Sequence, residues 1–179
     1  MRNWLVTDSH LFHVSMVKKE WRPADYQERL RRHWLSKVAP EDHVHHMGDV
    51  IMGPVERLLD FLNGLPGTKF LAAKGNHDHR SLATYCKMGF TAAYDATVLP
   101  SPVGDVYITH KPAYCLLRDT VLNVHGHLHD DLHRVEDYDG VYPQPWHRLL
   151  ALEYTDYSPV LLDEFVLTPG NFAYGNLGG

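Results

Sequence analysis

The sequence has few cysteines, no long apolar run and no excess of positive charge. Its two cysteines, Cys86 and Cys115, lie in unrelated segments without a CxxC pair, so neither a disulfide framework nor a cysteine-based metal site is expected. No apolar run approaches the roughly 18 residues needed to span a bilayer. The formal net charge of −5 argues against a broad basic surface for nucleic acid. The first residues do not resemble a signal peptide, so we expect a cytoplasmic protein without a membrane partner.

Histidine, by contrast, is unusually common, with 14 residues in a chain of 179. Globular domains have no structural need for so much imidazole, whereas metal sites do. The chain length suits one domain, which we place at residues 1–168. Residues 169–179 are rich in glycine and asparagine and are expected to form a flexible tail.

Short apolar runs alternate with helical periodicity in the first half of the chain. Strands are predicted at residues 4–6, 44–47 and 69–73, and helices at residues 25–38 and 55–62. This β-α-β-α-β order is typical of parallel strands joined by crossover helices.

The second half is richer in predicted strands. We place strands at residues 106–109 and 121–124, and a closing hairpin at residues 148–154 and 160–162. Residues 130–147, with many Asp, Tyr and Pro residues, are predicted to form an irregular loop. Substrate selectivity is expected to depend on this loop and on the loops at residues 11–24 and 79–90.

Residues that can bind a metal follow five of these apolar runs. They are Asp8 and His10, then Asp49, then Asn76 and His77, then His110, and finally His127 and His129. In open α/β sheets ligands collect beyond the carboxyl ends of the strands, so these segments can converge on one cleft. Imidazole, carboxylate and amide oxygen suit manganese, iron, zinc or nickel. A short carboxylate such as Asp49 can bridge two cations roughly 3.5–4 Å apart.

The order of these motifs resembles that of the calcineurin-like metallophosphoesterases. The shared segments are Asp8-Ser9-His10, Gly48-Asp49, Gly75-Asn76-His77-Asp78, His110 and Gly126-His127-Leu128-His129. The residues around the first and last motifs are similar to those of the short single-domain bacterial and phage members. The resemblance implies an α/β fold: a four-layer αββα sandwich in which two packed mixed β-sheets are flanked by helices.

The resemblance also implies a role for each site residue. One divalent metal ion would be held by Asp8, His10 and His129, the other by Asn76, His110 and His127, and Asp49 would bridge them. Mn²⁺ is the expected metal. A hydroxide between the metals would attack phosphorus, and His77 would protonate the leaving group or steady the phosphate. The segment after Asp49 lacks the Asp-Arg-Gly extension of the serine/threonine protein phosphatases, so a phosphoprotein substrate is not expected.

Three functions stay open at this point. The leading hypothesis is hydrolysis of a small phosphodiester or phosphomonoester, with a small-molecule or nucleotide diester favoured. The second is a non-catalytic binding module on the same fold. A protein that had lost catalysis should first lose a metal ligand or His77, and none of these residues is missing. A nuclease is the third, for which the acidic balance and short chain leave little room. The sequence does not indicate the oligomeric state.

Several further residues have roles that the pattern leaves open. His45 and His46 lie inside a predicted strand, which favours packing or a hydrogen bond to a ligand residue. His13 and Arg80 lie just past motif loops, and Arg80 is a weak candidate for a phosphate contact. The remaining ones are His125, which adjoins a motif glycine, and Tyr138, Tyr142 and Trp146, which either line the substrate site or only fix their loop.

Overall fold

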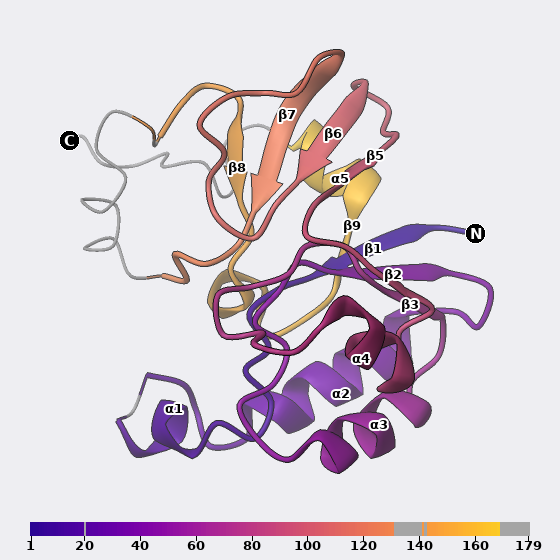
Figure 1. Cartoon of the computed structure of the whole chain (residues 1–179), viewed down its shortest axis with the longest axis vertical. Coiled ribbons are helices and arrows are strands. Elements are labelled where there is room, and N and C mark those ends of the chain that lie inside the picture. The colour runs from indigo at the N-terminus through magenta and orange to yellow at the C-terminus, as the bar shows by residue number, and fades with distance from the viewer. Residues whose placement is uncertain (20, 131–140, 142, 169–179) are drawn as a thin grey trace.

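The computed structural model describes residues 1–19, 21–130, 141 and 143–168. Two β-sheets pack face to face, and helices cover the outer face of the first (Figure 1). The expected sandwich of two mixed sheets with flanking helices is confirmed. None of the described helices is long and apolar enough to cross a membrane.

The first sheet has the strand order β4-β3-β2-β1-β9. Its strands are β1 (Asn3–Val6), β2 (His43–His46), β3 (Thr68–Leu71), β4 (Ala92–Ala93) and β9 (Val160–Leu161). The strands β1 to β4 pair in parallel, and β9 pairs antiparallel with β1. The predicted β-α-β-α-β order of the first half is therefore confirmed, with α2 (Tyr26–Lys37) and α3 (Val55–Asn63) as the crossover helices.

The second sheet has the strand order β5-β6-β7-β8. Its strands are β5 (Thr97–Leu99), β6 (Asp105–Ile108), β7 (Thr120–His125) and β8 (His147–Leu149). Strands β6, β7 and β8 pair in parallel, and β5 pairs antiparallel with β6. The carboxyl ends of β6 and β7 lead into the segments that carry His110 and His127.

Alternation along β1 separates the two halves of the core. Trp4 and Val6 pack with the helix-side cluster, whereas Leu5 packs with the cluster between the sheets. In α2, Tyr26, Leu30 and Trp34 recur every four residues and are at most 2% exposed, which places one helix face against the first sheet. These buried faces fix the strands whose ends carry the site.

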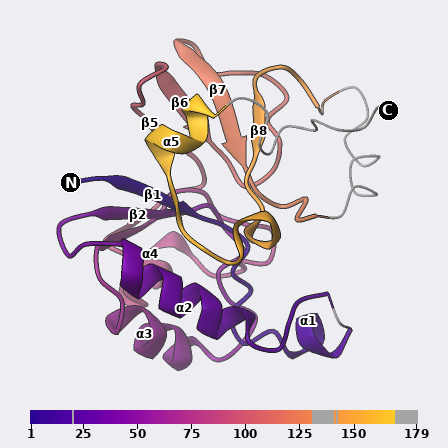
Figure 2. The ribbon, with the colours of Figure 1, turned by 180° about the vertical axis from the view of Figure 1, so that it is seen from behind.

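The described residues also form three short α-helices: α1 (Val14–Lys18), α4 (Leu82–Lys87) and α5 (Leu162–Leu167). Tyr85 of α4 belongs to the helix-side cluster. Leu162, Phe165 and Val166 of α5 belong to the cluster between the sheets. Seen from behind, α5 lies in front, at the junction of the two sheets (Figure 2).

The predicted closing hairpin of residues 148–154 and 160–162 is wrong. Strand β8 pairs with β7 in the second sheet, whereas β9 pairs with β1 in the first. A 3-10 helix at Leu152–Thr155 lies between them. Leu150 packs between the sheets and Leu152 packs on the helix side. This segment therefore crosses from one core to the other and does not alternate as a two-faced strand would.

The predicted tail at residues 169–179 and most of the predicted loop at residues 130–147, with Tyr138 and Tyr142, lie outside the described residues. Trp146 is described. Its carbonyl accepts the backbone N–H of Asn123 at 2.9 Å, and its ring lies 5.9 Å from that of His147. These contacts attach Trp146 to the second sheet.

Candidate metal centre

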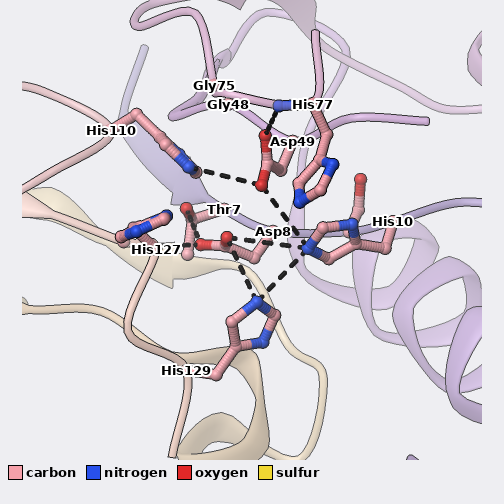
Figure 3. A network of polar contacts seen from close by, with 12 residues as sticks. Thr7, Asp8, His10, Gly48, Asp49, Gly75, His77, His110, His127 and His129 are labelled. Carbon is pink, nitrogen blue, oxygen red and sulfur yellow. Dashed lines mark hydrogen bonds and ion pairs between the residues drawn. The ribbon is translucent and has the colours of Figure 1, made fainter. Parts of the chain in front are cut away.

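The structure brings together the metal-competent residues that follow the strands. Asp8 and His10 follow β1, Asp49 follows β2, and the Asn76-His77 pair follows β3. In the other sheet His110 follows β6, and His127 and His129 follow β7. Two groups of ligand atoms result, each with its members within 4.8 Å of one another: Asp8, His10 and His129, and Asp49, His110 and His127. Figure 3 shows these side chains turned toward one another.

The first group consists of Asp8, His10 and His129. Oδ1 of Asp8 lies 3.4 Å from Nε2 of His129 and 3.8 Å from Nε2 of His10. The two imidazole nitrogens are 3.2 Å apart. Within the described part of the chain this buried Oδ1 has no hydrogen-bond partner. Such an oxygen is costly to bury, and a cation beside it would remove that cost, so the donor set fits a metal ion.

The second group is built around Asp49. Its Oδ2 lies 3.3 Å from Nε2 of His110 and 3.7 Å from Nε2 of His10, so one carboxylate oxygen faces both groups. Its Oδ1 accepts the backbone N–H of His77 at 2.8 Å. Oδ1 of Asn76 lies 3.0 Å from Nε2 of His110, which places the amide beside this second group. Asp49 thus lies between the two groups.

Backbone strain is concentrated in the candidate ligand residues. Positive φ angles occur at Asp8 (46°), His10 (39°), Asp49 (53°), His127 (68°) and His129 (53°). Each such conformation costs on the order of 1–3 kcal/mol and persists only where its surroundings hold it. Backbone bonds between adjacent strand ends contribute to this: Asp8 N–H donates to the Gly48 carbonyl and His10 N–H to the Asp49 carbonyl, both at 2.9 Å.

Two glycines allow the strand ends to approach closely. A Cβ on Gly126 would overlap Oγ1 of Thr7 and Oδ2 of Asp8, and a Cβ on Gly75 would overlap the Asp49 carboxylate. Backbone groups therefore come near enough to bind these carboxylates, and the N–H of His127 donates to Oδ2 of Asp8 at 2.9 Å. The glycines are needed for this packing and carry no chemistry themselves.

The groups of the centre shift one another's pKa values. Burial alone would raise the pKa of Asp8, but His129, His110 and His10 outweigh it and hold that pKa well below its usual range. Burial would lower the pKa of His110, but Asp8 and Asp49 raise it to about 9. Burial lowers the pKa of His10 to about 3, despite the nearby carboxylates. A metal ion bound at His110 would therefore displace a proton at neutral pH.

His77 lies beside both groups and is a member of neither. Its ring centroid is 5.6 Å from that of His10, and its backbone N–H is bound to Asp49. Figure 3 shows its ring next to those two residues. The side chain is only partly buried, so its imidazole has access to a ligand that approaches the centre.

No family model matches the sequence, and no curated protein matches it either. Solved structures similar to the chain include the following two. A protein of unknown function from Aquifex aeolicus is 21% identical with a TM-score of 0.70, over 89% of this chain and 95% of that one. A conserved uncharacterised protein from Streptococcus pneumoniae, a predicted phosphoesterase, is 19% identical with a TM-score of 0.35, over 71% of this chain and 62% of that one. The first likeness shows a shared fold.

Histidines outside the two groups have other contacts. His46 is buried, and its Nε2 lies 2.8 Å from Oγ of Ser9, which is a chain neighbour of Asp8 and His10 and not itself a proposed ligand. His45 stacks on Phe70, with ring centroids 5.2 Å apart, and bonds to Asn3, which confirms the packing role. The ring of His13 is 5.8 Å from that of His10.

The positions of His125 and Arg80 do not indicate a role at the centre. Nδ1 of the buried His125 lies 3.0 Å from the Gly126 carbonyl. Arg80 is exposed. Among the residues that the structure describes, His125 belongs to neither group of ligand atoms.

The sequence patterns assigned neither Arg22 nor Glu153 to the site. Both are buried beside the first group, where the Arg22 guanidinium donates to Glu153 at 2.6 Å and Glu153 lies 3.0 Å from Nδ1 of His129. Arg22 lies in a predicted loop without a motif. Glu153 lies in a segment predicted to form a hairpin strand, and no local spacing connects it with a ligand 24 residues away.

Proposed function

We propose that this protein is a metal-dependent phosphoesterase of the calcineurin-like type that hydrolyses a small phosphodiester or phosphomonoester. The observation that carries the proposal is the position of Oδ2 of Asp49, which faces His10 of one ligand group and His110 of the other. A carboxylate in that position is suited to bridge two cations. The motif order supports assignment to the short single-domain members, with residues 1–168 as the domain.

The residues proposed to hold the metals are those of the two groups together with Asn76. Asp8, His10 and His129 would bind one divalent ion and Asn76, His110 and His127 the other, with Asp49 shared. Bound cations would lower the pKa of a water between them and neutralise charge on the phosphoryl oxygens. Nitrogen and oxygen donors of this kind favour Mn²⁺ in our proposal, with iron, zinc and nickel as alternatives.

His77 is the proposed acid. Its backbone bond to Asp49 fixes the start of the side chain beside the centre. Its imidazole is partly exposed and lies outside both ligand groups, so a ring N–H is available to a leaving oxygen. An imidazole exchanges a proton near neutral pH and is therefore suited to protonate the departing alkoxide.

The proposed substrate is a small phosphoester, with a small-molecule or nucleotide diester favoured. The formal charge of −5 does not favour a long nucleic-acid track. The same balance is compatible with a single phosphoryl group, because bound cations would make the centre locally positive. A cytoplasmic location is part of the same proposal.

Hydrolysis of two chromogenic esters tests this function. Bis-p-nitrophenyl phosphate and p-nitrophenyl phosphate are incubated with the protein, first in chelator and then with added Mn²⁺. We expect cleavage of the diester that depends on the metal. No cleavage of either ester by protein shown to hold two metals per chain would contradict the proposal and favour a binding module. Cleavage of DNA or RNA that falls steeply with salt, without cleavage of the small diester, would indicate a nuclease.

A further inference from the structure

A buried ion pair lies directly behind the first ligand group. The side chains of Arg22 and Glu153 are 0% and 8% exposed. Nε and Nη2 of Arg22 donate to the same glutamate oxygen, Oε1, at 2.8 and 2.6 Å. Arg22 lies between α1 and α2, and Glu153 lies in the 3-10 helix after β8. The pair therefore joins two segments that are distant in the sequence and that meet at the centre.

This ion pair contacts the imidazole of His129 on the side away from Asp8. Nε2 of His129 faces Oδ1 of Asp8 at 3.4 Å, and Nδ1 lies 3.0 Å from Oε1 of Glu153. If Nε2 is the ligand atom, Nδ1 carries the proton and donates it to Glu153, because a neutral imidazole has one N–H. Nη2 of Arg22 is 3.0 Å from the same Nδ1. Both nitrogens then carry hydrogen, so they converge on Oε1 and do not bond to each other.

The same guanidinium holds the backbone of a second ligand residue. Nη1 of Arg22 donates to the carbonyl of Asp8 at 2.7 Å, and the Tyr26 hydroxyl donates to the carbonyl of His10 at 2.7 Å. Both ligand residues have left-handed backbone conformations, which need such support. The guanidinium carbon lies 5.2 Å from the Tyr26 ring and 5.6 Å from the Tyr157 ring, so aromatic contacts fix the arginine in turn.

We propose that Arg22 and Glu153 are positioning residues for the metal ion held by Asp8, His10 and His129. Glu153 holds His129 in the tautomer that presents Nε2, and Arg22 fixes both Glu153 and the Asp8 backbone. The proposal rests on the proposed function only in that a metal occupies this group. It predicts that changing the pair weakens one metal of the two.

A matched control is needed because breaking any buried ion pair destabilises a fold. The chain offers the ion pair of Arg2 with Asp42 at the opposite end of β1, in which the carboxylate is buried and the arginine side chain is half exposed. Asp42 is 1% exposed, accepts Nη2 of Arg2 at 2.8 Å and also accepts the Trp4 indole N–H at 2.9 Å. Arg2 and Asp42 precede β1 and β2, whereas the ligand residues follow those strands. The substitution Asp42→Asn should therefore lower stability without changing metal binding.

The experiment measures Mn²⁺ binding to metal-free wild type, Glu153→Gln and Asp42→Asn by equilibrium dialysis, with electron paramagnetic resonance on the same samples. We expect Glu153→Gln to bind one ion as wild type does and the other 10–100-fold more weakly, the usual effect of changing a partner of a metal ligand. At ion concentrations that fill only one site, the signal of an exchange-coupled Mn²⁺ pair should give way to that of a single ion. Asp42→Asn should bind both ions normally.

A second variant covers a failure of Glu153→Gln to fold. Arg22→Lys retains the charge but cannot reach Glu153 and the Asp8 carbonyl together, so it should weaken the same ion. Wild-type affinity for both ions in these variants, equal losses in Asp42→Asn, or a wild type that binds no Mn²⁺ would overturn the proposal. This experiment measures metal binding and no turnover. A wild type that binds two ions here but cleaves no ester in the hydrolysis assay would refute the proposed function and leave the positioning role of Arg22 and Glu153 intact.

Discussion

Replacing Asp49 by asparagine should weaken both metal sites at once. The substitution preserves the size of the side chain, and the amide oxygen can still accept the His77 N–H that Oδ1 accepts at 2.8 Å. The amide nitrogen then takes the place of Oδ2, which lies 3.7 Å from Nε2 of His10 and 3.3 Å from Nε2 of His110. An amide N–H₂ is a donor and cannot bind a cation, so each site loses one anionic oxygen.

The size of the effect follows from what each site loses. Changing an outer partner of a ligand typically lowers metal affinity 10–100-fold, so the loss of a ligand oxygen should lower it at least about 100-fold. That factor corresponds to about 2.8 kcal/mol for each ion. The matched variant Asp8→Asn removes an oxygen that lies near His10 and His129 only, so it should weaken one ion and leave the other bound.

The assay is the Mn²⁺ content per chain after dialysis against a series of buffered free-ion concentrations. For Asp49→Asn we expect both binding steps to move to higher concentration, and for Asp8→Asn only one. The reasoning would be refuted if Asp49→Asn retained one ion at wild-type affinity, because Asp49 would then belong to a single site.

Three further predictions concern His77, Gly126 and the buried His45. The variant His77→Ala should keep two Mn²⁺ per chain and lower the turnover of a diester with an alkoxide leaving group by roughly 10²–10⁴-fold, as expected for loss of a general acid; metal analysis that showed lost ions would contradict this role. In Gly126→Ala the new Cβ would overlap the Asp8 carboxylate, so denaturation in chelator should show a loss of about 1–3 kcal/mol, and unchanged stability would count against the close approach of the strand ends. Burial and, to a smaller extent, the nearby His43 lower the pKa of His45 to about 4, so the folded state binds fewer protons than the unfolded state between that value and the ordinary pKa of about 6.5. Stability should therefore fall as pH drops through this window, by about 1.4 kcal/mol per pH unit from this residue, and His45→Gln should flatten the measured slope by that amount; an identical slope in the variant would refute the assignment.

The first half of the fold could be predicted because its signals are local. Tyr26, Leu30 and Trp34 mark the buried face of α2 by their spacing alone, and the apolar run before Asp8 marks β1. The convergence of the strand ends could also be predicted, because ligands in such sheets gather at the carboxyl ends of the strands. This is why residues from both halves of the chain could be assigned to one site before their contacts were known.

What could not be predicted depends on contacts between distant segments. Leu150 and Leu152 are both buried, and only the packed structure shows that they belong to different cores. The apolar pattern around them therefore indicated a hairpin that does not form. Likewise, Arg22 and Glu153 are separated by 131 residues. Neither has a local pattern that distinguishes it from a surface charge, although together they lie behind a ligand group.

The proposed function requires a pair of metal ions that share Asp49 and serve phosphoester hydrolysis. The most direct test titrates Mn²⁺ into metal-free protein and measures, on the same samples, bound metal per chain and hydrolysis of bis-p-nitrophenyl phosphate. We predict that binding saturates at two ions per chain and that hydrolysis appears as the second ion binds. Saturation at one ion, or two bound ions without hydrolysis, would contradict the account.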